Sequence, residues 1–223
     1  FRERLSGLHP AAVRVVATNT FRVASNVQEF VALAERTLGL PIDIISGHEE
    51  GRLTFFGVAH ELPPSSVPRL VIDIGGGSTE FIIGRGFEPE RLESLTIGCV
   101  GLTQRFFRDG GITAAALDAA ETVARVEIEA IAGAFGAGAW REAYGSSGTA
   151  VALADILEQN AFSAGGITPS GLARLRRRML GAGHISRLRL NALKGERAPV
   201  LAGGLAIMSA AVAELGIERI DAV

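Results

Sequence analysis

The sequence predicts an α/β protein, in which strands and helices alternate along the chain. Residues 13–17 and 41–45 are short, mostly β-branched apolar runs, and residues 27–38 between them have the spacing of an amphipathic helix. This order predicts a strand–helix–strand unit. Residues 70–74 form a third β-branched run, typical of a strand buried on both faces. A long helical pattern with one apolar face follows Thr113, so helices are expected to cover the sheet.

The composition is that of an ordinary globular protein, and it argues against some classes of binding partner. The chain has 223 residues, of which 48% are hydrophobic, and this is enough for a real core. A net charge of −2 argues against a nucleic-acid coat or a polybasic membrane binder, so we expect neither DNA nor a membrane as partner. The single Cys99 excludes an internal disulfide and fits a reducing compartment. The uncharged run 198–213 is shorter than the ~20 residues that span a bilayer, and a cytoplasmic location is expected.

Residues 18–26 have the character of a polar connection, and Asn26 at its end is expected to cap the helix over 27–38. Arg22 lies in this connection. It is either a solvated loop cation, which is the commoner role of a lone arginine, or a phosphate ligand.

The start of the next helix carries two neighbouring carboxylates. Ser46 and Glu49 have the spacing of a capping box, in which the serine caps the helix and the glutamate reaches back to the cap amide. This gives Glu49 a structural task and leaves Glu50 without one. Glu50 is therefore a candidate base for activating water, although a carboxylate in the first turn of a helix is also a favourable charge by itself.

A Pro-rich linker leads into the stretch on which the functional argument depends. The run 70–74 contains Asp73, and it is followed by Gly75, Gly76, Gly77, Ser78, Thr79 and Glu80. A second apolar run over 81–84 places the glycines at the tip of a predicted β-hairpin. Backbone amides and two hydroxyls at such a tip suit phosphate oxygens. Asp73 beside them suits Mg²⁺, which takes one or two carboxylates together with phosphate oxygens. The alternative is that Asp73 only caps a plain tight turn.

Three further elements follow from the pattern. A third strand is expected near 92–97, and a short helix containing Leu102 and Phe106 comes after it. Thr113 is expected to cap a long amphipathic helix, whose predicted inner face carries Leu117, Ala124, Ile128, Ile131 and Phe135. The helix after Ser46 is expected to turn Leu53, Phe56 and Val58 inward.

A second loop of glycines and hydroxyls precedes the helix expected over 150–157. Its residues are Gly145, Ser146, Ser147, Gly148 and Thr149. Because the first amides of a helix lack partners, this loop suits an anion or a nucleotide phosphate; the alternative is an ordinary N-cap by Thr149. Among the later basic residues, those over 176–178 fit a solvated helix face. Lys194 and Arg197, in a loop before an apolar helix, are better phosphate candidates.

Taken together, these motifs resemble the exopolyphosphatase / guanosine pentaphosphate phosphohydrolase family, within the actin-like ATPase and sugar-kinase superfamily. Four stretches in the family's order carry the resemblance, 17–26, 46–52, 73–80 and 145–149, and the late segment 197–219 fits as well. The resemblance implies an actin-like (ribonuclease H-like) two-domain phosphatase fold.

The resemblance also implies how the chain is divided. Residues 1–48 would be the C-terminal part of the first actin-like domain, and residues 49–223 the second, truncated at its C-terminal end. The family's first phosphate loop, of Asp-x-Gly-Ser-Asn-Ser type, and its closing Leu-Arg-Glu-Gly segment have no match here. The chain also begins at Phe1 without Met, so a fragment is expected.

The family's functional residues carry over onto this sequence. By resemblance Glu50 activates the attacking water, and Asp73 and Glu80 serve that water and Mg²⁺ or another divalent cation. Phosphate would be bound by Arg22, by the loop Gly75, Gly76, Gly77, Ser78 and Thr79, and by Gly145, Ser147, Gly148, Thr149 and Arg197.

The expected reaction is in-line attack of water on the terminal phosphoanhydride of polyphosphate or guanosine pentaphosphate, in which catalysis is mostly positioning and charge neutralisation. We expect a homodimer. The alternatives are a kinase of the same superfamily that uses ATP, and a catalytically silent nucleotide- or alarmone-binding module.

Overall fold

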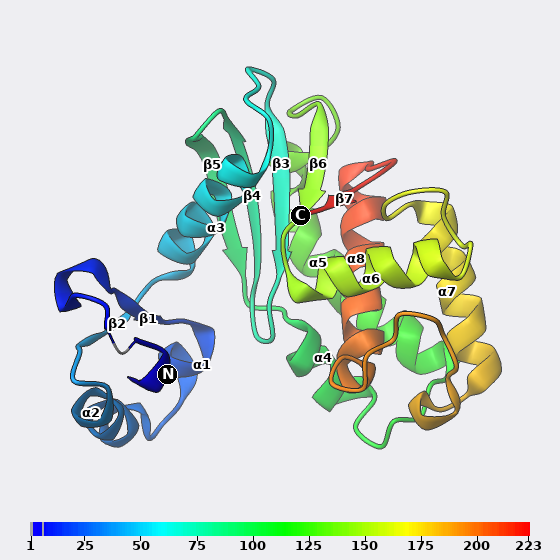
Figure 1. Ribbon diagram of the computed structural model, residues 1–223. Coiled ribbons are helices and arrows are strands. Elements are labelled where there is room, and N and C mark those ends of the chain that lie inside the picture. The colour runs from blue at the N-terminus through cyan, green and yellow to red at the C-terminus, as the bar shows by residue number, and fades with distance from the viewer. Residues whose placement is uncertain (1, 6) are drawn as a thin grey trace. The chain divides into compact units, whose positions relative to one another are not determined.

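The structure is a computed structural model that describes residues 2–5 and 7–223 (Figure 1). The chain divides into two compact units, Phe1–Glu50 and Gly51–Val223. The division lies inside one helix, α3 (Gly47–Glu61), close to the boundary at residue 48 that the sequence suggested. The assignment of these units to two actin-like domains stays a prediction.

The first unit contains the predicted strand–helix–strand unit. Strands β1 (Val15–Ala17) and β2 (Ile42–Ile44) are parallel, and α2 (Val27–Leu38) lies between them in the chain. The short helices are η1 (Arg2–Leu5), η2 (Pro10–Ala12) and α1 (Asn19–Val23). The connection over 18–26 therefore contains a helix that its polar composition did not indicate.

Helix α2 differs from the expectation at its start, and its apolar stripe is uncovered. Asn26 occupies the N-cap position, but its side chain makes no capping hydrogen bond, so its predicted role is wrong. No residue of α2 is buried, and Phe30 and Leu33 are more than half exposed. Both side chains line a pocket of about 1020 Å³ within this unit. The periodicity predicted the helix correctly, because it reports an apolar stripe whether or not another layer covers it.

The second unit is built on a five-stranded mixed sheet. Its strands are β3 (Arg69–Ile74), β4 (Thr79–Arg85), β5 (Glu88–Leu95), β6 (Glu142–Gly145) and β7 (Asp221–Ala222). The order is β5-β4-β3-β6-β7, with β4 antiparallel to both β3 and β5, and β6 parallel to both β3 and β7. The predicted β3–β4 hairpin is confirmed, and its first strand is the centre of the sheet.

Helices lie on both faces of this sheet (Figure 1). The larger core lies on the face where Leu70, Ile72 and Ile74 point, since side chains alternate along a strand. It includes residues from α4 (Cys99–Phe106), α5 (Ala114–Phe135), α6 (Gly148–Gln159), α7 (Pro169–Ala182) and α8 (Leu201–Leu215). The short helices η3 (Ile185–Arg187) and η4 (Ala198–Val200) connect α7 to α8. On the other face, Val71 packs with residues of α3, so Asp73 also points to the α3 face.

Most of the expected helix features are confirmed. The Thr113 hydroxyl accepts a hydrogen bond from the amide of Ala116, and the predicted inner face of α5 is buried. One inward assignment in α3 is wrong: Phe56 is 46% exposed, whereas Phe55 is 1% exposed. The tertiary contact decides this, because Phe55 packs on Val71 and on β4 in the smaller core.

Helix α8 lies at the centre of the larger core. By length and composition alone, Ala198–Leu215 could cross a membrane, and it is the one such segment in the described part of the chain. In this fold 67% of it is buried. A Cβ on Gly203 would collide with the carbonyl of Cys99, and one on Gly204 would crowd Thr149. The glycines thus allow α4 and the start of α6 to approach α8 closely, as a core helix requires.

Tyr144 belongs to a polar cluster on the α3 face of the sheet. Its hydroxyl donates to Glu142 at 3.1 Å, and Arg69 pairs with the same carboxylate at 2.8 Å. Burial and this hydrogen bond to Glu142 raise the pKa of Tyr144 above its ordinary value of 10.0. A raised pKa means that the folded state holds the proton more tightly, so the contribution to stability is present below pH 10 and is lost as the pH rises further.

Because Tyr144 is the one tyrosine of the sequence, its ionisation can be followed alone. We expect a spectrophotometric titration of tyrosinate to give a midpoint above 10. Glu142→Gln should lower that midpoint but leave it raised, since burial remains. Circular dichroism at each pH checks that the chain is still folded. A midpoint at or below 10 in the folded protein contradicts the partly buried position of the ring.

Candidate active site

The glycine loop between β3 and β4 is fixed by its contact with α4. The amide of Cys99 donates to the carbonyl of Gly75 at 3.0 Å, and the amides of Val100 and Gly101 donate to the carbonyl of Gly76 at 3.0 and 3.2 Å. These loop carbonyls therefore cap the start of α4. A Cβ on Gly98 would collide with the backbone of Gly76, so this approach requires glycine at position 98.

This contact also orients the amides of the loop. The described chain contains no cis peptide bond, and a trans peptide places its C=O and N–H on opposite sides. Since the carbonyls of Gly75 and Gly76 point to α4, the N–H groups of Gly76 and Gly77 point away from it. Two neighbouring amides directed to one side are the arrangement that binds an anion.

The two loop hydroxyls have a different setting. Thr79 is fully buried, and its hydroxyl donates to the carbonyl of Ile97 at 2.7 Å. Ser78 is 4% exposed. The backbone amides are therefore the better candidates for a phosphate contact, and the predicted contacts of Ser78 and Thr79 stay predictions.

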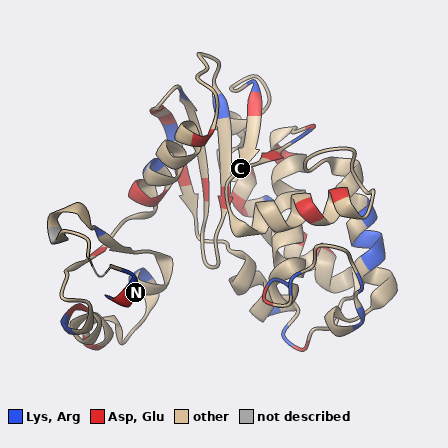
Figure 2. Cartoon of the chain, in the orientation of Figure 1, with Lys and Arg blue, Asp and Glu red and all other residues tan. Residues whose placement is uncertain are grey.

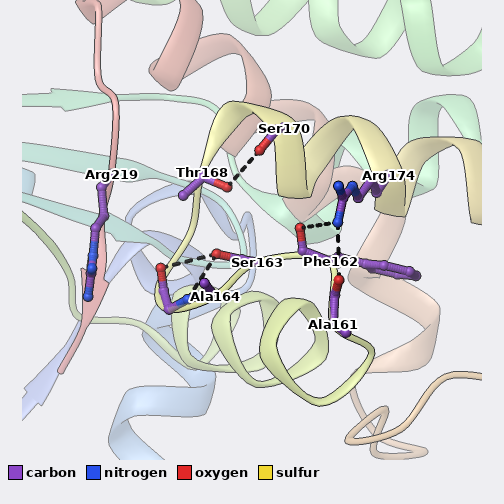
Figure 3. Close-up of a pocket in the computed structure, with 9 residues that line it drawn as sticks. Ala161, Phe162, Ser163, Ala164, Thr168, Ser170, Arg174 and Arg219 are labelled. Atoms are coloured by element: carbon purple, nitrogen blue, oxygen red, sulfur yellow. Dashed lines mark hydrogen bonds between the residues drawn. The ribbon is translucent and has the colours of Figure 1, made fainter.

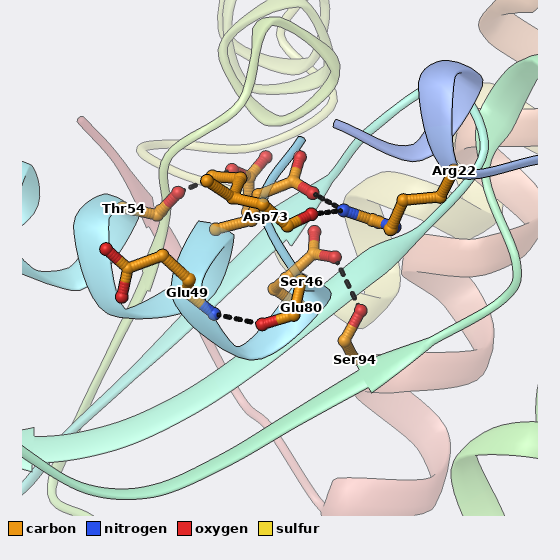
Figure 4. A network of polar contacts seen from close by, with 9 residues as sticks. Arg22, Ser46, Glu49, Thr54, Asp73, Glu80 and Ser94 are labelled. Atoms are coloured by element: carbon orange, nitrogen blue, oxygen red, sulfur yellow. Dashed lines mark hydrogen bonds and ion pairs between the residues drawn. The ribbon is translucent and has the colours of Figure 1, made fainter. Parts of the chain in front are cut away.

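Three polar side chains form a row across the α3 face of the sheet. In the strand register Asp73 lies opposite Glu80, and Glu80 lies opposite Ser94. Thr54 of α3 donates to Asp73 at 3.1 Å, and Ser94 donates to Glu80 at 2.8 Å (Figure 4). Glu80 is 1% exposed, whereas Asp73 is partly exposed. The hairpin thus brings the two predicted carboxylates together, with Asp73 as the one nearer to solvent.

This pair fits a magnesium ion in its donor chemistry. Directly opposed residues in an antiparallel pair have Cβ atoms about 4.5–5.5 Å apart, so the carboxylates of Asp73 and Glu80 can share one neighbourhood. Mg²⁺ is commonly held by one or two carboxylates with phosphate oxygens and waters. The described residues contain no group of three or more His, Cys, Asp or Glu that could hold a metal by themselves. Any metal here would depend on oxygens from substrate or water.

The second glycine loop lies against the first. Ser147 is the N-cap of α6, since its hydroxyl accepts from the amide of Ala150 at 3.1 Å, and it also accepts from the amide of Ile74 at 3.3 Å. The Thr149 hydroxyl donates to the carbonyl of Ile74 at 3.0 Å. The alternative in which Thr149 caps the helix is therefore wrong. Both hydroxyls hold the start of α6 to the last residue of β3, next to Gly75.

Arg197 lies over the start of α6. A Cβ built on Gly148 would collide with the guanidinium of Arg197, so the two are in direct contact. Gly148 is the first residue of α6, whose N-terminal amides carry partial positive charge. The structure therefore brings a cation, a helix start and the first glycine loop into one region of the second unit.

In the first unit, Arg22 and Glu50 form an ion pair. Arg22 Nη1 lies 3.0 Å from Glu50 Oε2 and also donates to the carbonyl of Ile45 at 2.9 Å (Figure 4). Both side chains are less than a quarter exposed. The interpretation of Arg22 as a solvated loop cation is wrong, because it belongs to α1 and is held by two partners.

For the neighbouring Glu49, the structure shows one of the two contacts of the predicted capping box. The Ser46 hydroxyl accepts from the amide of Glu49 at 3.1 Å, which is the serine half of the capping box. The Glu49 carboxylate also forms an ion pair with Arg14, with 3.5 Å between Oε1 of Glu49 and Nη1 of Arg14. Glu49 and Glu50 thus contact different arginines from the same helix turn, and Thr54 follows Glu50 by one turn of α3.

Sequence reasoning missed some polar residues of this region. Thr54 and Ser94 carry no motif, and only the strand register and the α3 packing show that they contact the two carboxylates. A pocket of about 640 Å³ at the α6–α7 connection was also missed (Figure 3). Its wall includes Ser163, Thr168, Ser170, Arg174 and Arg219. Four of these five residues lie within 163–174, and the fold brings Arg219 from the C-terminal segment to join them.

Comparison with known proteins agrees with the resemblance drawn from the motifs. A model of the Ppx/GppA phosphatase family matches residues 1–222. A solved Ppx/GppA enzyme of Aquifex aeolicus is 24% identical, with a TM-score of 0.73, and the match covers 94% of this chain and 71% of that one.

Two further solved structures are similar. An exopolyphosphatase of Cytophaga hutchinsonii is 23% identical, with a TM-score of 0.81 over 99% of this chain and 73% of that one. An exopolyphosphatase-like protein is 26% identical, with a TM-score of 0.78 over 93% of this chain and 69% of that one. These matches confirm the α/β fold of the actin-like, ribonuclease H-like type.

Proposed function

This chain belongs to the Ppx/GppA phosphatase family, and we propose that it hydrolyses the terminal phosphoanhydride of inorganic polyphosphate or the 5′-terminal phosphate of guanosine pentaphosphate. That it is a hydrolase of the phosphatase type follows from the family. The observation that carries the finer proposal is the meeting of two glycine loops at Ile74, beside the Asp73–Glu80 pair.

The two loops supply the groups that hold the transferred phosphoryl. The amides of Gly76 and Gly77 point away from α4, and Arg197 lies over the first residue of α6. Fixed amides and a cation of this kind neutralise the negative charge that is spread over the phosphoryl oxygens in the transition state. Because these groups are already held in place, they need no reorganisation during the reaction.

Glu50 is proposed to take the proton of the attacking water, and Arg22 holds its carboxylate through the 3.0 Å ion pair. Asp73 is the proposed metal ligand nearer to solvent, and Glu80 lies behind it, oriented by Ser94. A bound Mg²⁺ would supply charge neutralisation on the phosphate oxygens. Thr54 fixes the orientation of the Asp73 carboxylate.

The decisive experiment compares hydrolysis with transfer. We expect the full-length protein to release inorganic phosphate from tripolyphosphate, longer polyphosphate or guanosine pentaphosphate in the presence of Mg²⁺, without an acceptor. Transfer of phosphate from ATP to an acceptor, with no release to water, would favour the kinase alternative. Tight binding of these compounds with no turnover would favour a silent binding module.

A further inference from the structure

The charges of the second unit are strongly segregated. Between Glu158 and Glu196 the sequence contains no Asp or Glu, in a chain whose net charge is −2. The same stretch carries seven basic residues: Arg174, Arg176, Arg177, Arg178, Arg187, Arg189 and Lys194. In Figure 2 the blue ribbon segments of this part of the chain lie on α7 and on the loops that follow it. Such a concentration of one sign attracts a polyanion.

Among the residues that the structure describes, no carboxylate forms an ion pair with six of these seven side chains. Arg176 differs from the others, because it pairs with Asp118 and Glu121 of α5. Arg174 instead donates to the carbonyl of Ala161 at 3.1 Å, and Arg178 donates to the carbonyl of Arg189 at 3.4 Å.

Other members of the stretch are arranged in the same way. Arg189 donates to the carbonyls of Ser186 and Leu188 at 2.8 and 3.1 Å. Arg177, Arg187 and Lys194 are exposed. A guanidinium bonded to carbonyls is held in place but keeps its full positive charge. We call Arg174, Arg177, Arg178, Arg187, Arg189 and Lys194 the basic track.

The basic track leads to the proposed phosphate site. Asn191 is tied to the C-terminal end of α6 by three hydrogen bonds. Its backbone carbonyl accepts from the side-chain amide of Asn160, its backbone amide donates to Oδ1 of Asn160, and its side chain donates to the carbonyl of Gln159. Six residues later, Arg197 lies over Gly148 at the other end of α6. The segment that carries Lys194 therefore runs along α6, from the arginines of α7 towards the start of the helix.

The chemistry of the track favours a ligand without bases. Apart from the His184 ring, no aromatic side chain occurs between Ser163 and Val200. Single-stranded nucleic acids are bound largely by stacking of bases on aromatic side chains, and that platform is missing from this stretch. Inorganic polyphosphate offers only charged oxygens, which arginines bind well. The nearby acids are Asp155 and Glu158 on α6 and Glu196 beside Arg197.

We propose that the basic track binds the distal phosphates of a long inorganic polyphosphate chain whose reacting end lies near Arg197 and Gly148. This inference rests on the proposed function and selects polyphosphate as the substrate. It makes substrate affinity depend on chain length, because only a chain longer than the reacting site can reach α7. It also makes affinity for long chains fall with salt, as phosphate contacts release counterions.

The test is the double variant Arg177→Gln/Arg187→Gln, in which two exposed charges are removed. For polyphosphate of about a hundred phosphates, we expect KM to rise roughly three- to tenfold, as the loss of two exposed charge contacts implies. The slope of log KM against log salt should flatten by roughly 1.4, at ~0.7 for each lost contact to a flexible chain. For tripolyphosphate, KM and kcat should not change. The matched control is Arg91→Gln/Arg141→Gln, which removes two exposed arginines elsewhere in the unit.

The possible results separate failure of the basic track from failure of the proposed hydrolytic function. If the wild type hydrolyses long polyphosphate and the track variant has wild-type KM at every length, the basic track is not a substrate site. The same follows if a single-stranded oligonucleotide, and not polyphosphate, is bound more weakly by the track variant than by the control. If wild-type protein releases no phosphate but binds long polyphosphate through the track in a direct titration, the proposed function fails and the track stands.

Discussion

Replacing Glu50 with glutamine is expected to lower turnover by roughly 10²–10⁴, the usual contribution of a general base. The amide oxygen of glutamine can still accept from Arg22, so the fold and substrate binding should be retained. The effect should therefore fall on kcat, with KM little changed, because the lost interaction acts only on the reacting water. Steady-state phosphate release and thermal melting measure the two quantities.

Glu49→Gln is the matched control for this change, since it removes the same charge from the same helix turn. The Glu49 side chain contacts Arg14, and its backbone amide donates to the Ser46 hydroxyl; the return contact of a capping box, from the Glu49 carboxylate to the cap amide, stays a prediction. Its loss should cost about 1 kcal/mol of stability or less, with near wild-type turnover. If Glu49→Gln is inactive and Glu50→Gln has normal turnover, the assignment of the base is wrong, together with the capping argument that separated the two residues.

Replacing Asp73 with asparagine should weaken the response to Mg²⁺ and lower turnover together. The asparagine oxygen can still accept from Thr54, so the hairpin should keep its structure. The loss of a charged metal ligand should reduce kcat/KM at fixed Mg²⁺ by roughly 10²-fold, which corresponds to a few kcal/mol of transition-state charge neutralisation. The measurement is an Mg²⁺ titration of activity, with the Mg²⁺-dependent shift in melting temperature as a second readout.

Asp118→Asn is the control for Asp73→Asn. Asp118 is an exposed carboxylate of α5 that pairs with Arg176, and its loss should leave the Mg²⁺ titration unchanged. If Asp73→Asn keeps the wild-type titration curve and the wild-type melting shift, Asp73 is a turn residue and the metal site must be placed elsewhere.

Local pattern was sufficient for most of the elements of this chain. The strand–helix–strand unit, the glycine hairpin and the long helix after Thr113 all follow from apolar periodicity and from turn residues, which act within a few positions. The predictions that were wrong concern residues whose orientation depends on a contact with a part of the chain distant in sequence. Phe55 rather than Phe56 points inward because Val71 and β4 lie on its side. Ser147 rather than Thr149 caps α6 because Thr149 bonds to Ile74.

The same distinction holds for the candidate site. The sequence by itself determined the chemical groups, since glycines, hydroxyls and carboxylates in this order are typical of phosphate chemistry and matched a family. Only the tertiary structure decided which groups meet: the register puts Glu80 opposite Asp73, and α4 turns the amides of Gly76 and Gly77 outward. The basic track also depends on the fold, because the segment from Asn191 to Arg197 lies along α6 only after packing. Motifs report residue type and spacing, whereas the position of a charge depends on contacts between residues that are distant in the chain.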